Sequence, residues 1–208
     1  MKIIEIKNLN PPEVKIIKFA RFTDNRGYFT EPFRKSQFLK EAIPDFNIFQ
    51  INESCSKKGV IRGLHFQWNP YMGKLVRTIK GHMIDLFLDI RKGSPTFGKI
   101  NVFDMPATEK DEISTWIWIP VGFAHGNIFL KETIIEYLCT GEYSQGCEAG
   151  ISPLSKDIDW SLCDVNLKKI INKQIKKGLI ISEKDQKGLT LKEWFNDKRS
   201  ENFIYGKL

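Results

Sequence analysis

The sequence predicts a mostly β protein, an antiparallel β barrel or sandwich that carries a short helical appendage at its C-terminus. Residues 1 to about 160 contain short β-rich runs separated by Gly, Pro, Asn and Asp, a spacing typical of all-β domains. From about Leu167 the apolar spacing becomes helical and lysines accumulate. The 208 residues fit one domain. We divide it into a β-barrel unit over 1–165 and a Lys-rich, partly helical appendage over 166–208.

The segment from His82 to Ile90 gives the clearest strand. Its even-numbered positions from 84 to 90 are aliphatic, whereas the odd-numbered face includes Asp85 and Asp89. Successive side chains of a strand point to opposite faces of the sheet. Acids on the second face therefore indicate contact either with solvent or with a polar cavity.

The remaining elements follow in chain order. SPTFG (94–98) predicts a turn, and residues 116–120 predict a strand that ends at its proline. Residues 133–137 are again β-rich. Near the end, Thr190 and Glu193 have the spacing of a capping box, which predicts the start of a short final helix.

Composition excludes several classes of protein. No apolar run approaches the ~20 residues of a membrane span, and the first residues lack the apolar core of a signal peptide. We therefore expect a cytoplasmic protein without a membrane partner. The 32 Lys and Arg against 25 Asp and Glu give a net charge of +7, but many lysines fall in the late helical stretch, which predicts a solvated tail rather than a nucleic-acid site.

Cysteine and histidine are both scarce. The four cysteines include no CxxC pair, so we expect free thiols. The three histidines include no HxH pair, and nothing local argues for a metal site. His82 follows a glycine at the start of a strand, and its simplest interpretation is a surface residue.

His65 lies in an unusual setting, because an arginine, a glycine and this histidine interrupt a β-type run, GVIRGLHFQ (59–67). Five further motifs accompany it in a fixed order: DNRGYFTE (24–31), FQINES (49–54), KLVR (74–77), LDIRKGSPTFG (88–98) and WIPVGFAHG (118–126). On these motifs the chain resembles the dTDP-4-dehydrorhamnose 3,5-epimerase family from about Phe22 to Trp160. The resemblance resumes weakly at ISEKDQKGLTLKEW (181–194). It implies a cupin-type β barrel that epimerises nucleotide-linked 4-keto sugars.

The chemistry of such a reaction agrees with the matching residue types. Epimerisation beside a ketone needs a base with a pKa near neutrality, a cation facing the developing enolate, worth about 3–4 kcal/mol in comparable sites, and a proton donor on the opposite face. The resemblance implies His65 as the base, Lys74 as the cation and Tyr137 as the donor. The alternatives without a catalytic role are a solvated strand-edge lysine for Lys74 and a tyrosine that only packs for Tyr137.

The resemblance also implies a set of substrate-binding residues. Arginine forks suit the two phosphates of a nucleoside diphosphate, and Arg26 and Arg62 match such positions. Asp85 joins the set because its face of the strand can meet the same cavity. The remaining matches, which line the pocket around base and sugar, are Glu31, Gln50, Asn52 and His125.

The carboxylate that orients the family's base is the weakest match. Counting forward from Glu148 places Ser155 where the acid is expected, so we favour Asp157, two residues later. Two alternatives stay open: Asp85 supports His65, or no carboxylate does.

The sequence thus predicts a homodimeric epimerase that inverts C3 and/or C5 of a nucleotide-diphospho-4-keto-6-deoxy sugar, without a cofactor and without a metal. One alternative enzyme acts at a single carbon or on another sugar, such as a GDP-linked 4-keto-heptose. A different class is a sugar-nucleotide-binding relative that has lost turnover. A basic nucleic-acid-binding barrel is disfavoured because the charge lies in the tail.

Overall fold

The structure is a computed structural model that describes residues 1–43 and 47–208. It is mostly β, and all ladders between its named strands are antiparallel. The strands are β1 (Ile3–Asn8), β2 (Lys15–Ala20), β3 (Phe22–Asp24), β4 (Gly27–Phe29), β5 (Gln50–Ser56), β6 (Ile61–Gln67), β7 (Lys74–Asp89), β8 (Ile100–Ala107), β9 (Ile113–Ile119), β10 (Phe123–Phe129), β11 (Thr133–Cys139) and β12 (Glu148–Gly150). The helices are α1 (Lys35–Glu41), α2 (Val165–Lys176), α3 (Glu183–Gln186), α4 (Leu191–Asn196) and the 3₁₀ helix η1 (Lys198–Asn202).

The long strand β7 belongs to both faces of a sandwich. Its first half pairs with β9 and β11, and its second half pairs with β8 and β10. The change falls at Gly81, which has a φ of 108°. A Cβ there would lie 2.4 Å from the carbonyl oxygen of Glu132, so only glycine fits this close approach. The first sheet thus runs β1-β2-β9-β7-β11-β5, and the second runs β8-β7-β10-β6-β12.

Three apolar layers hold the two sheets, and each follows from side-chain alternation along the strands. The middle layer, between the sheets, includes Phe87 and Ile117. Helix α1 covers the outer face of the first sheet, where Phe38 packs near Trp116. The outer face of the second sheet lies under the C-terminal segment and includes the aliphatic face of residues 84–90. The acids on the opposite face of that strand therefore point into the sandwich.

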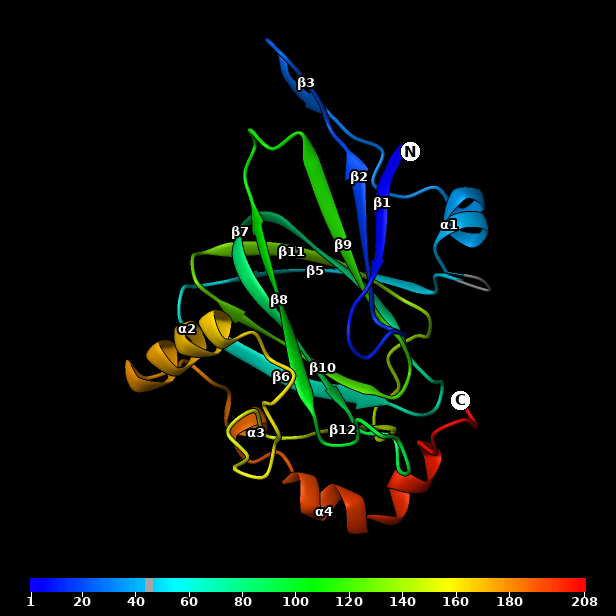
Figure 1. The fold of residues 1–208 in the computed structure, drawn as a ribbon, viewed down its shortest axis with the longest axis vertical. Helices are drawn as coiled ribbons and strands as arrows, with labels where there is room; N and C mark the ends of the chain where they lie inside the picture. The colour runs from blue at the N-terminus through cyan, green and yellow to red at the C-terminus, as the bar shows by residue number, and fades with distance from the viewer. Residues whose placement is uncertain (44–46) are drawn as a thin grey trace.

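The C-terminal segment is a lid of short helices over the second sheet (Figure 1). Trp194 of α4 is fully buried, and its ring lies 4.6 Å from that of Phe66 on β6. The predicted capping box is present at the start of α4, between Thr190 and Glu193. Helical structure begins at Val165, close to the position that the sequence indicates.

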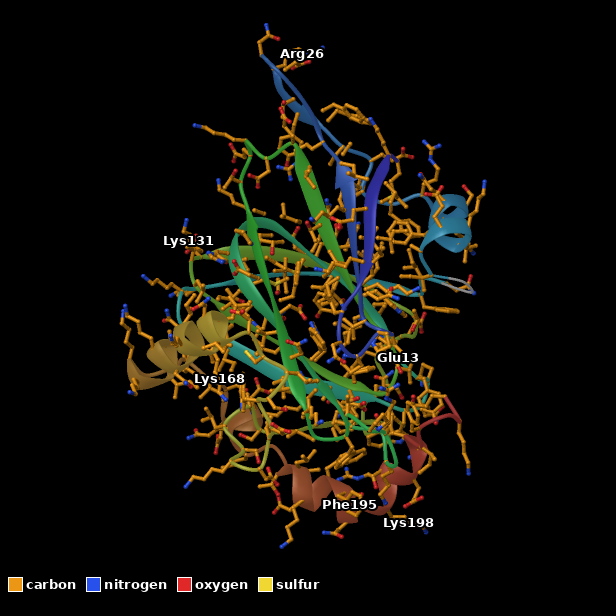
Figure 2. The ribbon with its side chains drawn as sticks, viewed as in Figure 1. Glu13, Arg26, Lys131, Lys168, Phe195 and Lys198 are labelled. Atoms are coloured by element: carbon orange, nitrogen blue, oxygen red, sulfur yellow. The ribbon has the colours of Figure 1, made fainter. Side chains whose placement is uncertain are left out.

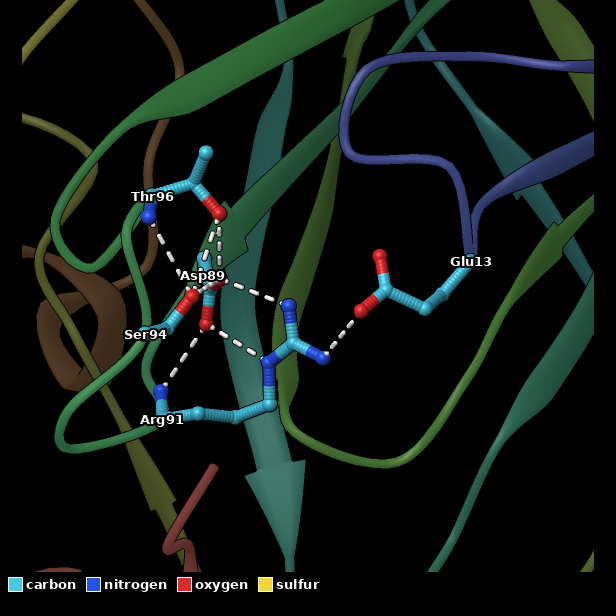
Figure 3. A network of polar contacts seen from close by, with 5 residues as sticks. All are labelled: Glu13, Asp89, Arg91, Ser94 and Thr96. Carbon is cyan, nitrogen blue, oxygen red and sulfur yellow. Dashed lines mark hydrogen bonds and ion pairs between the residues drawn. The ribbon is translucent and has the colours of Figure 1, made fainter. Parts of the chain in front are cut away.

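Asp89 is the centre of a buried polar network at the end of β7 (Figure 3). Its carboxylate accepts hydrogen bonds from Arg91 Nη2 at 2.7 Å, Ser94 Oγ at 2.6 Å and Thr96 Oγ1 at 2.7 Å. Arg91 also donates to Glu13 at 2.7 Å. The network fixes the turn that SPTFG predicts, so this part of the motif is structural.

The hairpin of β3 and β4 extends beyond the body of the molecule (Figure 1). Its side chains are exposed, including the aromatic residues Phe22, Tyr28 and Phe29, which are 55%, 41% and 69% accessible. Exposed aromatic residues grouped on a projecting element are a common sign of a contact surface.

Candidate active site

A cavity of about 560 Å³ opens between the two sheets, close to the segment that joins α2 to α3. Its volume is typical of a small-molecule site. The polar side chains that line it come from five strands and one helix and its cap: Ser54, Arg62, His65, Lys74, His125, Asn127, Tyr137, Ser182, Lys184 and Asp185. The cavity thus gathers several of the residues that the sequence predicts.

His65 of β6 is paired with a carboxylate from far along the chain. Its Nε2 lies 2.7 Å from Oδ1 of Asp185, 120 residues later. His65 is 35% accessible and faces the cavity, whereas Asp185 is 7% accessible. Such a pair fixes the tautomer of the imidazole and stabilises the imidazolium that forms when it takes a proton.

Asp185 is itself held in place by its surroundings. Its Oδ2 accepts a hydrogen bond from the backbone N–H of Gly63 at 3.3 Å, and its own N–H donates to Ser182 Oγ, the cap of α3, at 3.1 Å. Burial alone would raise the pKa of Asp185, but the hydrogen bond and charge of His65, with these donors, hold that pKa below its usual range. The carboxylate is therefore ionised at neutral pH.

The expectation that Asp157 supports His65 is wrong. Its carboxylate accepts hydrogen bonds from the backbone N–H groups of Leu191 at 3.2 Å and Lys192 at 2.8 Å, so it caps the start of α4. Ser155, the other candidate position, donates to Asp157. The alternative of Asp85 fails as well, because its hydrogen bonds go to other partners.

Asp85 of β7 lies behind the cavity wall, fully buried. Its Oδ2 accepts hydrogen bonds from Nε2 of His125 at 2.8 Å and Nδ2 of Asn127 at 2.9 Å, and both donors line the cavity. Burial raises the pKa of Asp85, and its two donors oppose this rise. Asp85 therefore orients His125 and Asn127 from behind. It is not itself among the described residues that line the cavity.

Lys74 begins β7 at the cavity, opposite Cys139 of β11. Burial lowers the pKa of its ammonium below the ordinary value for lysine, while the nearby carboxylates of Asp85 and Glu148 act in the opposite direction. The protonated form of this side chain places a positive charge in surroundings of low polarity, where electrostatic interactions are strong.

Tyr137 of β11 also lines the cavity. Burial raises the pKa of its phenol, which therefore stays protonated at neutral pH. Asn52 lies directly opposite it on β5 and is oriented by Gln50, whose Nε2 donates to Asn52 Oδ1 at 2.9 Å. A base with its carboxylate, a cation and a protonated phenol around one cavity can remove and return protons beside a carbonyl group.

Besides Asp85, four of the predicted substrate-binding residues are not part of the described cavity lining, namely Gln50, Asn52, Arg26 and Glu31. Arg26 is at the tip of the projecting hairpin (Figure 2), where its Nη2 pairs with Asp24 at 2.6 Å. Glu31 pairs with Arg34 and with the N-terminal ammonium. Within one chain, the structure therefore does not bring Arg26 and Glu31 to His65.

Sequence reasoning missed a second polar cluster at the cavity rim. Oε1 of Glu148 accepts hydrogen bonds from Lys184 Nζ at 2.7 Å and from Tyr143 Oη at 3.0 Å. Arg62, a predicted substrate-binding residue, is exposed and lines the same cavity. Its Nε donates a hydrogen bond to Ser56 Oγ at 2.9 Å. The signal for Lys184 and Asp185 was the charged pair in the ISEKDQKG motif (181–188).

The described residues hold neither a metal-binding cluster nor a membrane-spanning helix. Residues 1–43 and 47–208 contain no group of three or more His, Cys, Asp or Glu side chains arranged to hold a metal ion. Over the same ranges, none of the helices combines the length and apolarity needed to cross a bilayer.

His82, which the sequence places at the surface, has a side chain that is 24% accessible, and its Nε2 lies 2.6 Å from Oδ1 of Asp104.

Comparison with known proteins places these features in one family. The model of the family described as dTDP-4-dehydrorhamnose 3,5-epimerase matches residues 8–193. A relative of that name from Sinorhizobium fredii is 43% identical over 148 residues, which cover 70% of this chain and 73% of the relative. Another from Methanothermobacter thermautotrophicus is 39% identical over 181 residues, covering 86% and 89%.

A solved structure agrees with these sequence matches. The Legionella pneumophila dTDP-6-deoxy-D-glucose-3,5-epimerase, in complex with dTDP-4-keto-L-rhamnose, superposes with a TM-score of 0.79 at 32% identity and covers 96% of this chain and 97% of its own. The predicted cupin-type fold is thereby confirmed. The chain therefore belongs to the dTDP-4-dehydrorhamnose 3,5-epimerase family, isomerases that invert C3 and/or C5 of a nucleotide-linked 4-keto-6-deoxy sugar.

Proposed function

We propose that His65 removes the proton beside the ketone of a dTDP-linked 4-keto-6-deoxy sugar, at C3 and at C5 in turn. The observation that carries this proposal is the 2.7 Å contact between His65 and the buried carboxylate of Asp185, on the wall of a cavity that Lys74 and Tyr137 also line. As His65 becomes imidazolium, the neighbouring anion stabilises it, which lowers the barrier to proton removal.

The other two residues complete the proton transfer. Loss of the proton moves negative charge onto the ketone oxygen, and the ammonium of Lys74 stabilises that enolate in the low-polarity cavity. Tyr137 then donates its phenolic proton to the carbon from the face opposite His65, which inverts the configuration. A phenol whose pKa is raised by burial holds its proton until the enolate forms.

The nucleotide specificity is tested by solvent exchange. We incubate the protein in D₂O with dTDP-, GDP- and CDP-linked 4-keto-6-deoxy sugars and follow deuterium incorporation by NMR. The proposal predicts exchange with the dTDP-linked sugar at a higher rate than with the other two. Equal exchange with all three contradicts the dTDP assignment.

We further propose that the active protein is a homodimer in which the β3–β4 hairpin of one subunit reaches the cavity of the other. The support is that Arg26 and Glu31 match substrate-binding positions of the family but are absent from the lining of their own chain's cavity, and that Arg26 lies at the tip of the projecting hairpin (Figure 2). The exposed aromatic residues of the hairpin are available for such a contact, and Arg26 would then meet the phosphates of the nucleotide.

Mixed dimers test this arrangement directly. The variants His65→Asn and Arg26→Glu are each expected to be impaired. If Arg26 serves the partner's cavity, a dimer of one variant with the other contains one fully native site, so mixing and re-equilibration restores activity. Mixing without any recovery contradicts the exchange of hairpins, because each site then carries its own defect.

A cytoplasmic location is part of the same proposal. The four cysteines, at positions 55, 139, 147 and 163, are free thiols in the structure. Free thiols are usual in proteins of a reducing compartment. Fractionation of the cells that produce the protein tests the location, and recovery of the enzyme outside the cytoplasmic fraction contradicts it.

A further inference from the structure

Gly150, the last residue of β12, lies directly opposite His65 in the antiparallel pair of β12 with β6. Side chains at opposed positions of such a pair stand on the same face of the sheet, side by side. A Cβ placed on Gly150 would lie only 3.0 Å from Cδ2 of His65 and 3.7 Å from its Nε2. The missing side chain therefore leaves the space that one edge of the imidazole ring occupies.

The crowded edge is the one that holds Asp185. The bond from His65 to Asp185 is made by Nε2, the second of the two ring atoms that a side chain at position 150 would approach. The chain that follows Asp185 also runs along β12, because the N–H of Leu189 donates to the carbonyl oxygen of Gly150 at 2.9 Å. Gly150 thus lies at the meeting point of the base, its carboxylate and the segment that carries the carboxylate.

We propose that Gly150 is a positioning residue for His65: its lack of a side chain lets the ring lie against β12, with Nε2 on Asp185 and Nδ1 presented to the cavity. This inference rests on the proposed role of His65 as the base. Gly150 does not have a left-handed backbone conformation, so alanine is compatible with the strand. The closest atom to an added Cβ belongs to the ring, and the carbonyl oxygen of Leu64 follows at 3.3 Å, so a substitution presses first on the imidazole and second on the backbone of β6.

A small displacement is enough to matter. At 3.0 Å the contact is closer than carbon atoms normally allow, because the preferred separation is about 3.5–4.0 Å. The ring must therefore shift by several tenths of an ångström, whereas catalytic groups have to be held within about 0.5 Å of productive geometry. Misplacement by 1 Å can cost roughly 10²-fold in rate.

The test compares Gly150→Ala and Gly150→Val with the control Ala149→Gly. Ala149 is the preceding residue of β12, and it packs against the apolar layer on the other side of the sheet. We expect kcat to fall about 10-fold for Gly150→Ala and about 10²-fold for Gly150→Val, with KM changed less than about twofold because the substrate-binding side chains remain. Ala149→Gly keeps the wild-type kcat.

A spectroscopic measurement separates this idea from the proposed function. The ¹⁵N chemical shifts of the His65 ring in the free protein report which nitrogen carries the proton. We expect the Nε2-protonated tautomer in the wild type and a larger Nδ1-protonated fraction in Gly150→Ala. This readout does not need turnover, so it stands even if the protein proves inactive on every 4-keto sugar.

Two outcomes overturn the inference. One is wild-type kcat in Gly150→Ala with unchanged His65 shifts. The other is a loss of kcat without any change in those shifts, which would assign the effect to something other than ring position. If Gly150→Val does not fold, the alanine variant alone decides.

Discussion

Asp185 and His65 are 120 residues apart in the chain, yet their side chains meet at 2.7 Å on the wall of the cavity. The contact joins strand β6 to the short helix α3, which the C-terminal segment brings across the edge of the second sheet. The C-terminal appendage is therefore part of the candidate active site and not only a cover for the sheet.

Asp185→Asn should slow solvent exchange into the sugar by roughly 10²–10⁴-fold, because the imidazolium loses its neighbouring anion and the tautomer is less fixed. Asp157→Asn is the matched control, since Asp157 lies outside the cavity at the cap of α4. We expect it to exchange at the wild-type rate. Equal slowing in both variants contradicts the pairing.

His65→Asn should abolish exchange while the affinity for dTDP changes little, because binding of the phosphates and of the thymine ring does not depend on the imidazole. Asparagine keeps a side chain of similar size but cannot act as a base at neutral pH. Exchange is followed by NMR and binding by calorimetry. A wild-type exchange rate in this variant removes His65 from the mechanism.

Tyr137→Phe should impair inversion more than exchange. His65 can return a deuteron to the face from which it took the proton, so label still enters the sugar, but the donor on the other face is missing. The measurement is the ratio of label incorporated to product formed. If the variant inverts at the normal rate, Tyr137 only packs against its neighbours.

Lys74 predicts a loss of activity at alkaline pH. Burial lowers the pKa of its ammonium, so the charge that stabilises the enolate disappears as pH rises, at a lower pH than for an ordinary lysine. Tyr137 and Cys139 face the same region, and burial raises the pKa of both groups above their ordinary values. Lys74→Arg should retain some activity without the alkaline decline. An unchanged decline in that variant contradicts the assignment.

Asp89 predicts the behaviour of the fold in acid. Burial alone would raise the pKa of Asp89, but hydrogen bonds from Arg91, Ser94 and Thr96 hold it below the usual range. A carboxyl whose folded pKa is depressed stabilises the fold above its unfolded pKa and loses that contribution as pH falls through the folded value. Asp89→Asn should therefore cost about 3–5 kcal/mol at neutral pH, as expected for one half of a buried ion pair.

Denaturant unfolding measures this loss, and the dependence on pH should be weaker in Asp89→Asn than in the wild type. Asp159→Asn provides the comparison, since that carboxylate is exposed and bonds only to Ser161 among the residues described. A neutral effect of Asp89→Asn would mean that the network in Figure 3 is not needed for the turn.

The strands and the first half of the site could be predicted because their signals are local. The alternation around Asp85 identified β7, and the motif around His65 selected the histidine that lines the cavity. Local alternation could not decide whether Asp85 and Asp89 face solvent or the protein interior, because that depends on which sheet packs above them. Both proved buried.

The partner of His65 could not be found in the same way. Counting along the chain from Glu148 assumes that the carboxylate comes from the loop after β12, and that assumption selected Asp157. The structure supplies it instead from beyond α2, where residues 188–190 run beside β12. The separation of Arg26 from the cavity of its own chain escaped prediction for a related reason, since the DNRGYFTE motif does not reveal that its hairpin projects from the body of the fold.

The central claim is tested most directly by the fate of the two C–H protons in the wild-type protein. We incubate it in D₂O with dTDP-4-keto-6-deoxyglucose and assign the label by NMR. The account predicts deuterium at both C3 and C5, with inverted configuration at each labelled carbon. Retention of both protons in a sugar that nevertheless binds would contradict it.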